Sequence, residues 1–233
     1  MKPYAELLRP HQYVKNVFLF LPAFFALRIT EWLVIQDTLL GFIGFSLVAS
    51  SVYILNDYMD RDADRMHPRK KDRPLAAGTV PVNAAFVMFG VCLLGGLGLI
   101  FWLDQEAFYW QLGYFIMNVL YTFRLKHIPI LDVSIISIGF VIRIMVGGLV
   151  VEGHVPISMW IVLMTFLGAL FLALAKRRDD VLLAADGREV RKSISGYNLE
   201  FINGAMMIMA SVLIVSYISY TISEEVQQRF GET

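Results

Sequence analysis

Long apolar stretches alternate with short polar connections along most of this chain. A bilayer core about 30 Å thick needs roughly 20 mostly apolar residues in a helix. We predict a transmembrane helix at each of seven stretches: Val14–Ile29, Trp32–Leu55, Pro81–Leu103, Phe108–Phe123, Pro129–Val151, Ser158–Ala175 and Leu199–Ile222. The pattern therefore predicts an all-α fold, a polytopic membrane helical bundle that forms one transmembrane domain over residues 1–233.

The composition agrees with a membrane protein. Hydrophobic residues make up 57% of the 233 positions, which is above the usual soluble composition and argues against a water-soluble globule. The 20 Lys and Arg balance the 20 Asp and Glu, so no global positive field attracts nucleic acid, and no nucleic-acid partner is expected. The composition does not indicate an oligomeric state.

Most of the basic residues lie on one side of the predicted membrane. They occupy the N-terminal segment and the connections 56–80, 124–128 and 176–198, whereas the opposite connections carry Asp104, Glu106 and Glu152. Cytoplasmic loops near span ends collect Lys and Arg. We therefore expect a multi-pass protein of the inner (plasma) membrane whose N-terminus and basic connections are cytoplasmic.

An acidic run follows the second predicted span. At about 100° per residue, Asp57, Asp60 and Asp64 share one helix face, whereas Asp62 points away. Like charges at a membrane-embedded helix end repel, so a cation should neutralise them. Magnesium prefers oxygen ligands and is usually held by one or two carboxylates together with substrate phosphates. We predict that the three aspartates are catalytic and bind Mg²⁺. The alternative is ion pairing with neighbouring arginines, namely Arg61, Arg65 and Arg69.

A basic segment follows these acids. Pro68 should end the helix just past His67, because the residue before a proline is pushed out of the α region. Lys70 and Arg73 would then lie in a loop beside the acidic face, where they suit a diphosphate with bound magnesium. Arg73 is the preferred phosphate ligand, and a simple topology signal is the alternative. His67 is a candidate acid or base, with a structural role as its alternative.

These residues carry a family resemblance. The run Asn56-Asp57-x-x-Asp60-x-x-x-Asp64 resembles the first aspartate-rich motif of the UbiA superfamily of intramembrane transferases, and His67-Pro68-x-Lys70-x-x-Arg73-Pro74 continues it. Within the superfamily the chain is most similar to the decaprenyl-phosphate phosphoribosyltransferases. That similarity rests on four further segments: Arg9–Asn16, Leu125–Asp132, Lys176–Arg178 and Arg191–Tyr197.

The resemblance implies transfer of 5-phosphoribose from phosphoribosyl diphosphate to a polyprenyl phosphate, with Mg²⁺ as cofactor and release of diphosphate at the cytoplasmic face. Lys126 joins the three aspartates as a catalytic candidate because it would grip phosphoryl oxygens. Asp132 would bind ribose hydroxyls, with steering of a lysine or helix capping as alternatives. The candidate substrate-binding residues are Lys15, for the lipid phosphate, with Asn16, Asn56, Lys70, Arg73, Asp132, Lys176, Arg177, Arg191 and Tyr197.

One feature favours the phosphoribosyl branch, and the chemistry of that reaction is reasonable for this sequence. The ordinary aromatic prenyltransferases carry a second aspartate-rich motif, whereas the corresponding region here offers only Asp132. A lipid phosphate is already an anion, so its attack on ribose needs no strong base, and the sequence contains no nucleophile motif for covalent catalysis. Two alternatives remain: an isoprenyl-diphosphate-dependent prenyltransferase, and a non-catalytic carrier of anionic lipids.

Two further expectations concern the bundle. Superfamily members resemble a nine-helix bundle, so a chain with seven spans either lacks the last two helices or is a genuinely short form. Arg143 lies within the fifth predicted span, where an unpaired guanidinium would be costly. We therefore expect Arg143 to face the protein interior.

Overall fold

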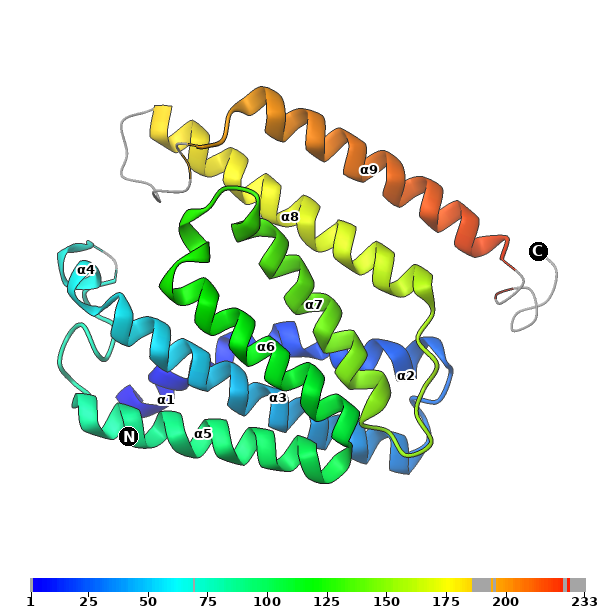
Figure 1. The fold of residues 1–233 in the computed structure, drawn as a ribbon, viewed down its shortest axis with the longest axis horizontal. Coiled ribbons are helices and arrows are strands. Elements are labelled where there is room, and N and C mark those ends of the chain that lie inside the picture. Colours follow the sequence, from blue (N-terminus) through cyan, green and yellow to red (C-terminus); the bar gives the residue numbers. More distant parts are fainter. Residues whose placement is uncertain (1, 69, 186–193, 195, 224–225, 227–233) are drawn as a thin grey trace. The chain divides into compact units, whose positions relative to one another are not determined.

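The computed structural model describes residues 2–68, 70–185, 194, 196–223 and 226, and every regular element in this part of the chain is a helix (Figure 1). The all-α prediction is confirmed. In chain order the elements are α1 (Lys2–Leu8), the 3-10 helix η1 (Pro10–Phe20), α2 (Leu21–Phe25), α3 (Trp32–Met59), α4 (Arg61–Met66), α5 (Val82–Leu103), α6 (Gln105–Phe123), the 3-10 helix η2 (Leu125–His127), α7 (Leu131–Leu149), α8 (Met159–Ala185) and α9 (Leu199–Thr221).

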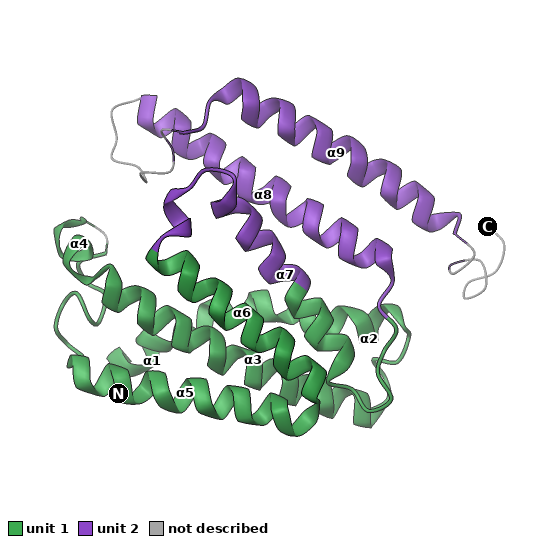
Figure 2. Cartoon of the chain, in the orientation of Figure 1, with its two compact units in different colours: residues 1–123, 142–156 green, residues 124–141, 157–233 purple. Residues whose placement is uncertain are grey.

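The chain divides into two compact units (Figure 2). Unit 1 comprises Met1–Phe123 and Ile142–Pro156, and unit 2 comprises Arg124–Val141 and Ile157–Thr233. The division falls within α7, so this helix contributes residues to both units.

Five helices in the described part of the chain are long and apolar enough to cross a membrane: α3, α5, α7, α8 and α9. All five coincide with predicted spans, but the predicted count of seven is not confirmed. The span predicted at Phe108–Phe123 is a helix, α6, which is less apolar because it carries polar residues such as Gln111 and Asn118. The chain is nevertheless a polytopic, all-helical membrane protein.

The span predicted at Val14–Ile29 is wrong as a single helix. This region contains η1 and the short α2 instead. Pro10 and Pro22 stand in the first turns of these two helices, where the missing N–H of proline costs nothing, so each proline marks a new helix start. Leu27, with a positive φ of 59°, then leads the chain away from the helical direction.

The 3-10 geometry of η1 matches its contacts with α3. A 3-10 helix has three residues per turn, so side chains three apart lie on one face. Tyr13 and Asn16 use this face to reach two serines of α3: the Tyr13 hydroxyl lies 2.8 Å from Ser50 Oγ, and Asn16 Nδ2 donates to Ser46 Oγ at 2.8 Å. Leu19, one turn further along η1, is fully buried. The periodicity of apolar residues alone does not reveal these polar contacts between η1 and α3.

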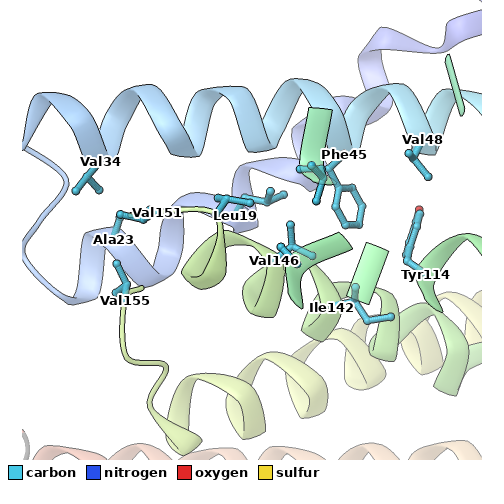
Figure 3. Packing of buried hydrophobic residues seen from close by; sticks show 13 residues of the cluster. Leu19, Ala23, Val34, Phe45, Val48, Tyr114, Ile142, Val146, Val151 and Val155 are labelled. Carbon is cyan, nitrogen blue, oxygen red and sulfur yellow. The ribbon is translucent and has the colours of Figure 1, made fainter. Parts of the chain in front are cut away.

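The main core of unit 1 joins η1, α2, α3, α5, α6 and the second half of α7 (Figure 3). Phe45 of α3 and Tyr114 of α6 meet at its centre with their ring centroids 4.6 Å apart. Val146 of α7 and Leu19 of η1 are fully buried in the same cluster. A smaller cluster, built on Leu7, Ile54, Leu75, Val80 and Ala85, fixes α1 against α3 and the segment before α5.

Helix α5 has a second apolar face that the described part of the chain leaves exposed. Val87, Val91, Leu94 and Phe101 lie on one side of the helix and are exposed, whereas Cys92 and other small residues on the opposite side are buried. A water-soluble monomer rarely exposes such a continuous apolar face. Together with the five apolar helices, this face identifies an integral membrane protein.

Close approach of α3 and α5 depends on Gly96. A Cβ at Gly96 would stand 2.6 Å from the carbonyl oxygen of Gly44, whereas a Cβ at Gly98 would meet nothing within 4 Å. We expect Gly96→Ala to lower the midpoint of thermal unfolding in detergent micelles. Gly98→Ala, the matched control, should not lower it, because alanine favours a helix interior over glycine by about 1 kcal/mol. Equal midpoints for the two variants would contradict the close contact.

Unit 2 contains the pair α8 and α9 and the first half of α7. Val133, Leu174, Tyr197 and Ile202 form its core and belong to α7, α8, the segment before α9, and α9. Helix α9 begins after Asn198, whose side-chain oxygen accepts a hydrogen bond from the Phe201 N–H at 2.7 Å. This N-cap fixes the start of α9 directly after Tyr197.

Candidate functional site

Two buried carboxylates meet where α3 passes into α4. Asp57 is 2% exposed and Asp64 is 3% exposed. The helices break at Asp60, but Asp60 N still donates to Asn56 O at 3.0 Å and Asp64 N to Asp60 O at 2.8 Å. These i to i−4 bonds carry the helical turn through the junction, so Asp57 and Asp64 stay on one side. Asp60 caps α3 and is partly exposed.

Asp62 faces away from this pair, as helical phase predicts. Its side chain is 76% exposed and contacts Arg61 and Arg65, with each guanidinium 3.3 Å from the carboxylate. Helix α4 ends at Met66, and His67 adopts an extended conformation before Pro68. The expected helix stop is therefore confirmed.

Arg73 joins the two buried carboxylates. Its Nη1 lies 3.3 Å from Asp57 Oδ1 and 2.6 Å from Asp64 Oδ2. Lys70 Nζ is 4.0 Å from Asp64 Oδ1. The basic loop after Pro68 thus folds back onto the acidic face. Both cations are partly exposed, whereas the carboxylates that they neutralise are almost completely buried.

Arg9 is a site residue that the sequence reasoning did not single out. It donates from Nη2 to Asp57 Oδ1, and its guanidinium lies 5.5 Å from the centre of the Tyr53 ring. Its backbone is left-handed, with φ 54° and ψ 55°, at the start of η1. The available signal is its place in the segment Arg9–Asn16, which carries part of the family resemblance.

The oxygen-rich donor set fits a magnesium ion. In the described residues no three His, Cys, Asp or Glu side chains form a ready metal site. Magnesium, however, is usually held by one or two carboxylates with water and phosphates completing its shell. Asn56 Oδ1, beside Asp57 in sequence, is buried and accepts no hydrogen bond from any described residue. A hard cation or a donor group beside it would satisfy this oxygen.

The remaining predicted residues of unit 1 differ in burial. Lys15 is exposed, as a residue that meets a lipid headgroup would be. Asn16 is 1% exposed, and its side chain is engaged by Ser46 and by Arg143, whose Nε donates to Asn16 Oδ1 at 2.8 Å. Arg143 also donates to the Tyr114 hydroxyl at 3.2 Å. The expectation that Arg143 faces the interior is confirmed. In this structure Asn16 joins η1 to α3 and α7 through hydrogen bonds.

In unit 2, three predicted residues form a buried polar cluster. Asp132 at the start of α7 is 0% exposed, and Arg177 of α8 is 2% exposed. Arg177 Nε donates to Asp132 Oδ2 at 2.8 Å, and its Nη1 donates to Asp180 Oδ2 at 2.7 Å. The Tyr197 hydroxyl donates to Asp132 Oδ1 at 2.6 Å and accepts from the Ile130 N–H at 2.7 Å.

This cluster fixes the backbone at the start of α7. Ile130 has a positive φ of 70°, and the Tyr197 hydroxyl holds its N–H. Burial, followed by the hydrogen bond to Asp132, raises the pKa of the Tyr197 hydroxyl above its ordinary value, so Tyr197 remains a neutral donor. Asp132 thus holds a cation, Arg177, at the start of α7.

The other predicted residues of unit 2 are Lys126, Lys176 and Arg191. Lys126 belongs to η2 and is partly exposed, and Lys176 of α8 is exposed. Arg191 lies outside the described residues.

Comparison with known proteins places the chain in a family. Residues 16–224 match the UbiA prenyltransferase family. The chain belongs to that family. It is 34% identical over 215 residues to a decaprenyl-phosphate phosphoribosyltransferase of Mycolicibacterium smegmatis, covering 90% of this chain and 67% of that protein. For the corresponding protein of Corynebacterium glutamicum the identity is 35%, covering 90% of this chain and 64% of the relative. The chain thus spans about two thirds of the length of these relatives.

Solved UbiA structures share the fold. The structure of a UbiA homologue from Archaeoglobus fulgidus bound to GPP and Mg²⁺ aligns with a TM-score of 0.77 at 21% identity, covering 97% of this chain and 81% of that one. The part of the chain that matches the UbiA family contains both the aspartates of unit 1 and the polar cluster of unit 2. Arg9 and Lys15 precede the matched residues.

Proposed function

We propose that this UbiA-family chain is a magnesium-dependent enzyme that transfers 5-phosphoribose from phosphoribosyl diphosphate to a polyprenyl phosphate. The names of its relatives support this reaction, at 34% and 35% identity. The observation that carries the proposal is the arrangement of Asp57 and Asp64 beside Arg9 and Arg73. Buried carboxylates can hold a divalent ion, and guanidinium groups beside them suit the oxygens of a diphosphate.

The proposed reaction is one displacement. An oxygen of the lipid phosphate attacks the anomeric carbon of the ribose, and the bond from that carbon to the diphosphate breaks with its electron pair on the leaving diphosphate. The acceptor is already ionised, so no residue needs to remove a proton from it. Catalysis then depends on holding two anions together and on stabilising the leaving group.

Each residue of the site has a proposed task. Asp57 and Asp64, with Asp60 at the helix junction, would hold magnesium, which when bound supplies positive charge to the leaving diphosphate. Arg73 and Lys70 would bind phosphoryl oxygens, as guanidinium and ammonium donors do. Lys15 would bind the lipid phosphate. Lys126 and Lys176 remain candidates for further phosphoryl contacts, and Arg177 serves first as the partner of Asp132.

We also propose an orientation. The basic segments that carry Arg9, Lys70, Arg73 and Lys126 belong on the cytoplasmic side, because short loops rich in Lys and Arg stay there. A cytoplasmic site is also where a soluble, highly charged sugar diphosphate would be available. Reaction of engineered single cysteines in these loops with a membrane-impermeant reagent, in cells and in inverted vesicles, tests this placement.

Incubation of the purified protein with radiolabelled phosphoribosyl diphosphate, polyprenyl phosphate and Mg²⁺ tests the reaction. We expect label in the extracted lipid, and loss of that label when a chelator removes the metal. A parallel incubation with a labelled allylic diphosphate tests the alternative donor. Transfer from the allylic diphosphate alone would overturn the phosphoribosyl assignment, and lipid binding without transfer from either donor would favour a carrier.

A further inference from the structure

Cationic side chains of the protein already neutralise the two buried carboxylates at the α3–α4 junction. Arg9 and Arg73 contact Asp57, and Arg73 and Lys70 approach Asp64. Three cationic side chains therefore face two buried carboxylates. A carboxylate that is almost completely buried needs such partners, because loss of water disfavours its charged form.

This neutralisation opposes the binding of a metal ion alone. A dication placed between Asp57 and Asp64 would add two positive charges beside carboxylates that cationic side chains already neutralise. It would also displace the bonds from Arg73, which occupies an oxygen of each aspartate. A diphosphate brings several negative charges of its own, and the displaced guanidinium groups can bind its oxygens.

We infer that Arg9 and Arg73 exchange partners during the binding of the donor. Before the donor binds, they neutralise Asp57 and Asp64. When a diphosphate arrives with its metal ion, the carboxylates turn to the metal and the two guanidinium groups turn to phosphoryl oxygens. This inference rests on the proposed function only in requiring that the donor carry a diphosphate. It assigns Arg9, for which the sequence analysis predicted no role, to the donor site.

The placement of Arg9 supports this role. Arg9 holds a left-handed backbone conformation, which residues other than glycine rarely adopt. From this position its guanidinium contacts both the Asp57 carboxylate and the Tyr53 ring, and the side chain is only partly exposed.

Because of this exchange of partners, the affinity for the metal ion and the affinity for the diphosphate depend on each other. If the metal binds poorly without the diphosphate and well with it, then by linkage the diphosphate must also bind poorly without the metal. Removing one of the two guanidinium groups should therefore affect the two ligands in opposite directions. The carboxylates become more available to a metal alone, while the diphosphate loses a partner.

Two binding measurements on the purified protein in lipid nanodiscs test this inference. The first is the affinity for Mn²⁺ alone, followed by electron paramagnetic resonance. The second is the retention of radiolabelled inorganic diphosphate at saturating Mg²⁺, followed by equilibrium dialysis. For Arg9→Gln we expect Mn²⁺ alone to bind about tenfold more tightly and diphosphate about tenfold more weakly than in the wild type.

Further variants separate partner exchange from misfolding. Arg73→Gln should give the same pair of opposite shifts, and Arg9→Lys, which keeps the charge, should leave the affinity for Mn²⁺ near that of the wild type. Arg61→Gln is the matched control, because Arg61 contacts the exposed Asp62, and it should change neither affinity. Unchanged Mn²⁺ binding in Arg9→Gln and Arg73→Gln, or weaker binding of both ligands in the two variants, would overturn the inference.

The outcome is independent of the transfer assay. Opposite shifts without transfer of phosphoribose would support partner exchange for a different diphosphate donor and would overturn the proposed reaction. Transfer of phosphoribose with unchanged Mn²⁺ affinity in both arginine variants would support the reaction and overturn partner exchange.

Discussion

Asp57→Asn is expected to lower the rate of phosphoribose transfer by a factor of about 10² to 10³, the usual cost of removing one preorganised electrostatic group. Asparagine has nearly the shape of aspartate, so the packing at the end of α3 should survive. The charge that holds Arg9 and Arg73 is lost, together with a proposed metal ligand. The measurement is the initial rate of label transfer to lipid at saturating Mg²⁺.

Asp62→Asn is the matched control for this prediction. Asp62 belongs to the same acidic run, but its side chain is 76% exposed and contacts only Arg61 and Arg65 among the residues that the structure describes. Its rate should stay within about twofold of the wild type, since exposed ion pairs contribute little. Similar losses in both variants would show that the rate responds to the total charge of the run, and an unchanged rate in Asp57→Asn would remove this carboxylate from the mechanism.

Helical phase was sufficient to separate these aspartates. It assigns Asp57, Asp60 and Asp64 to one face and Asp62 to another. The structure brings Asp57 and Asp64 together and leaves Asp62 exposed, because hydrogen bonds of the i to i−4 type continue across the junction at Asp60. The five long apolar helices were also predictable, since the length and hydropathy of a span follow directly from bilayer thickness. Both successes depend on interactions that are local in sequence.

Two features that the sequence does not reveal, the contact of Arg9 with Asp57 and the 3-10 helix around Asn16, depend on contacts between residues far apart in the chain. Arg9 lies 48 residues from Asp57, and its guanidinium bonds to that carboxylate from a left-handed backbone position that no periodicity predicts. The segment around Asn16 has the hydropathy of a span, yet it forms a 3-10 helix that bonds to serines of α3. Mean hydropathy cannot distinguish a transmembrane helix from an apolar 3-10 helix that is bonded to another helix of the protein.

The polar cluster of unit 2 also depends on contacts between residues that are far apart in the chain. The sequence predicts Asp132, Arg177 and Tyr197 as separate ligands for the substrate. They are 45 and 65 residues apart, and the structure joins them through hydrogen bonds of 2.8 and 2.6 Å. In this arrangement both carboxylate oxygens of Asp132 already have a partner in the protein. A role of Asp132 in stabilising the folded protein can therefore be tested.

Asp132→Asn is expected to lower the free energy of unfolding by about 3 kcal/mol, because it leaves the buried Arg177 without its main partner. Equilibrium unfolding in mixed micelles measures this loss. Asp180→Asn is the control: Asp180 contacts the same guanidinium, but its side chain is 21% exposed. Its loss should be about 1 kcal/mol or less, since water can replace part of the interaction.

The double variant Asp132→Asn with Arg177→Gln tests the cause of the loss. If the damage comes from a buried charge without a partner, then removing that charge as well should restore part of the stability lost in Asp132→Asn. If Asp132 acts only as a substrate ligand, Asp132→Asn should keep the unfolding free energy of the wild type and lose transfer activity alone. That result would contradict the structural role, because a carboxylate bonded to both Arg177 and Tyr197 cannot be removed from a buried site without cost.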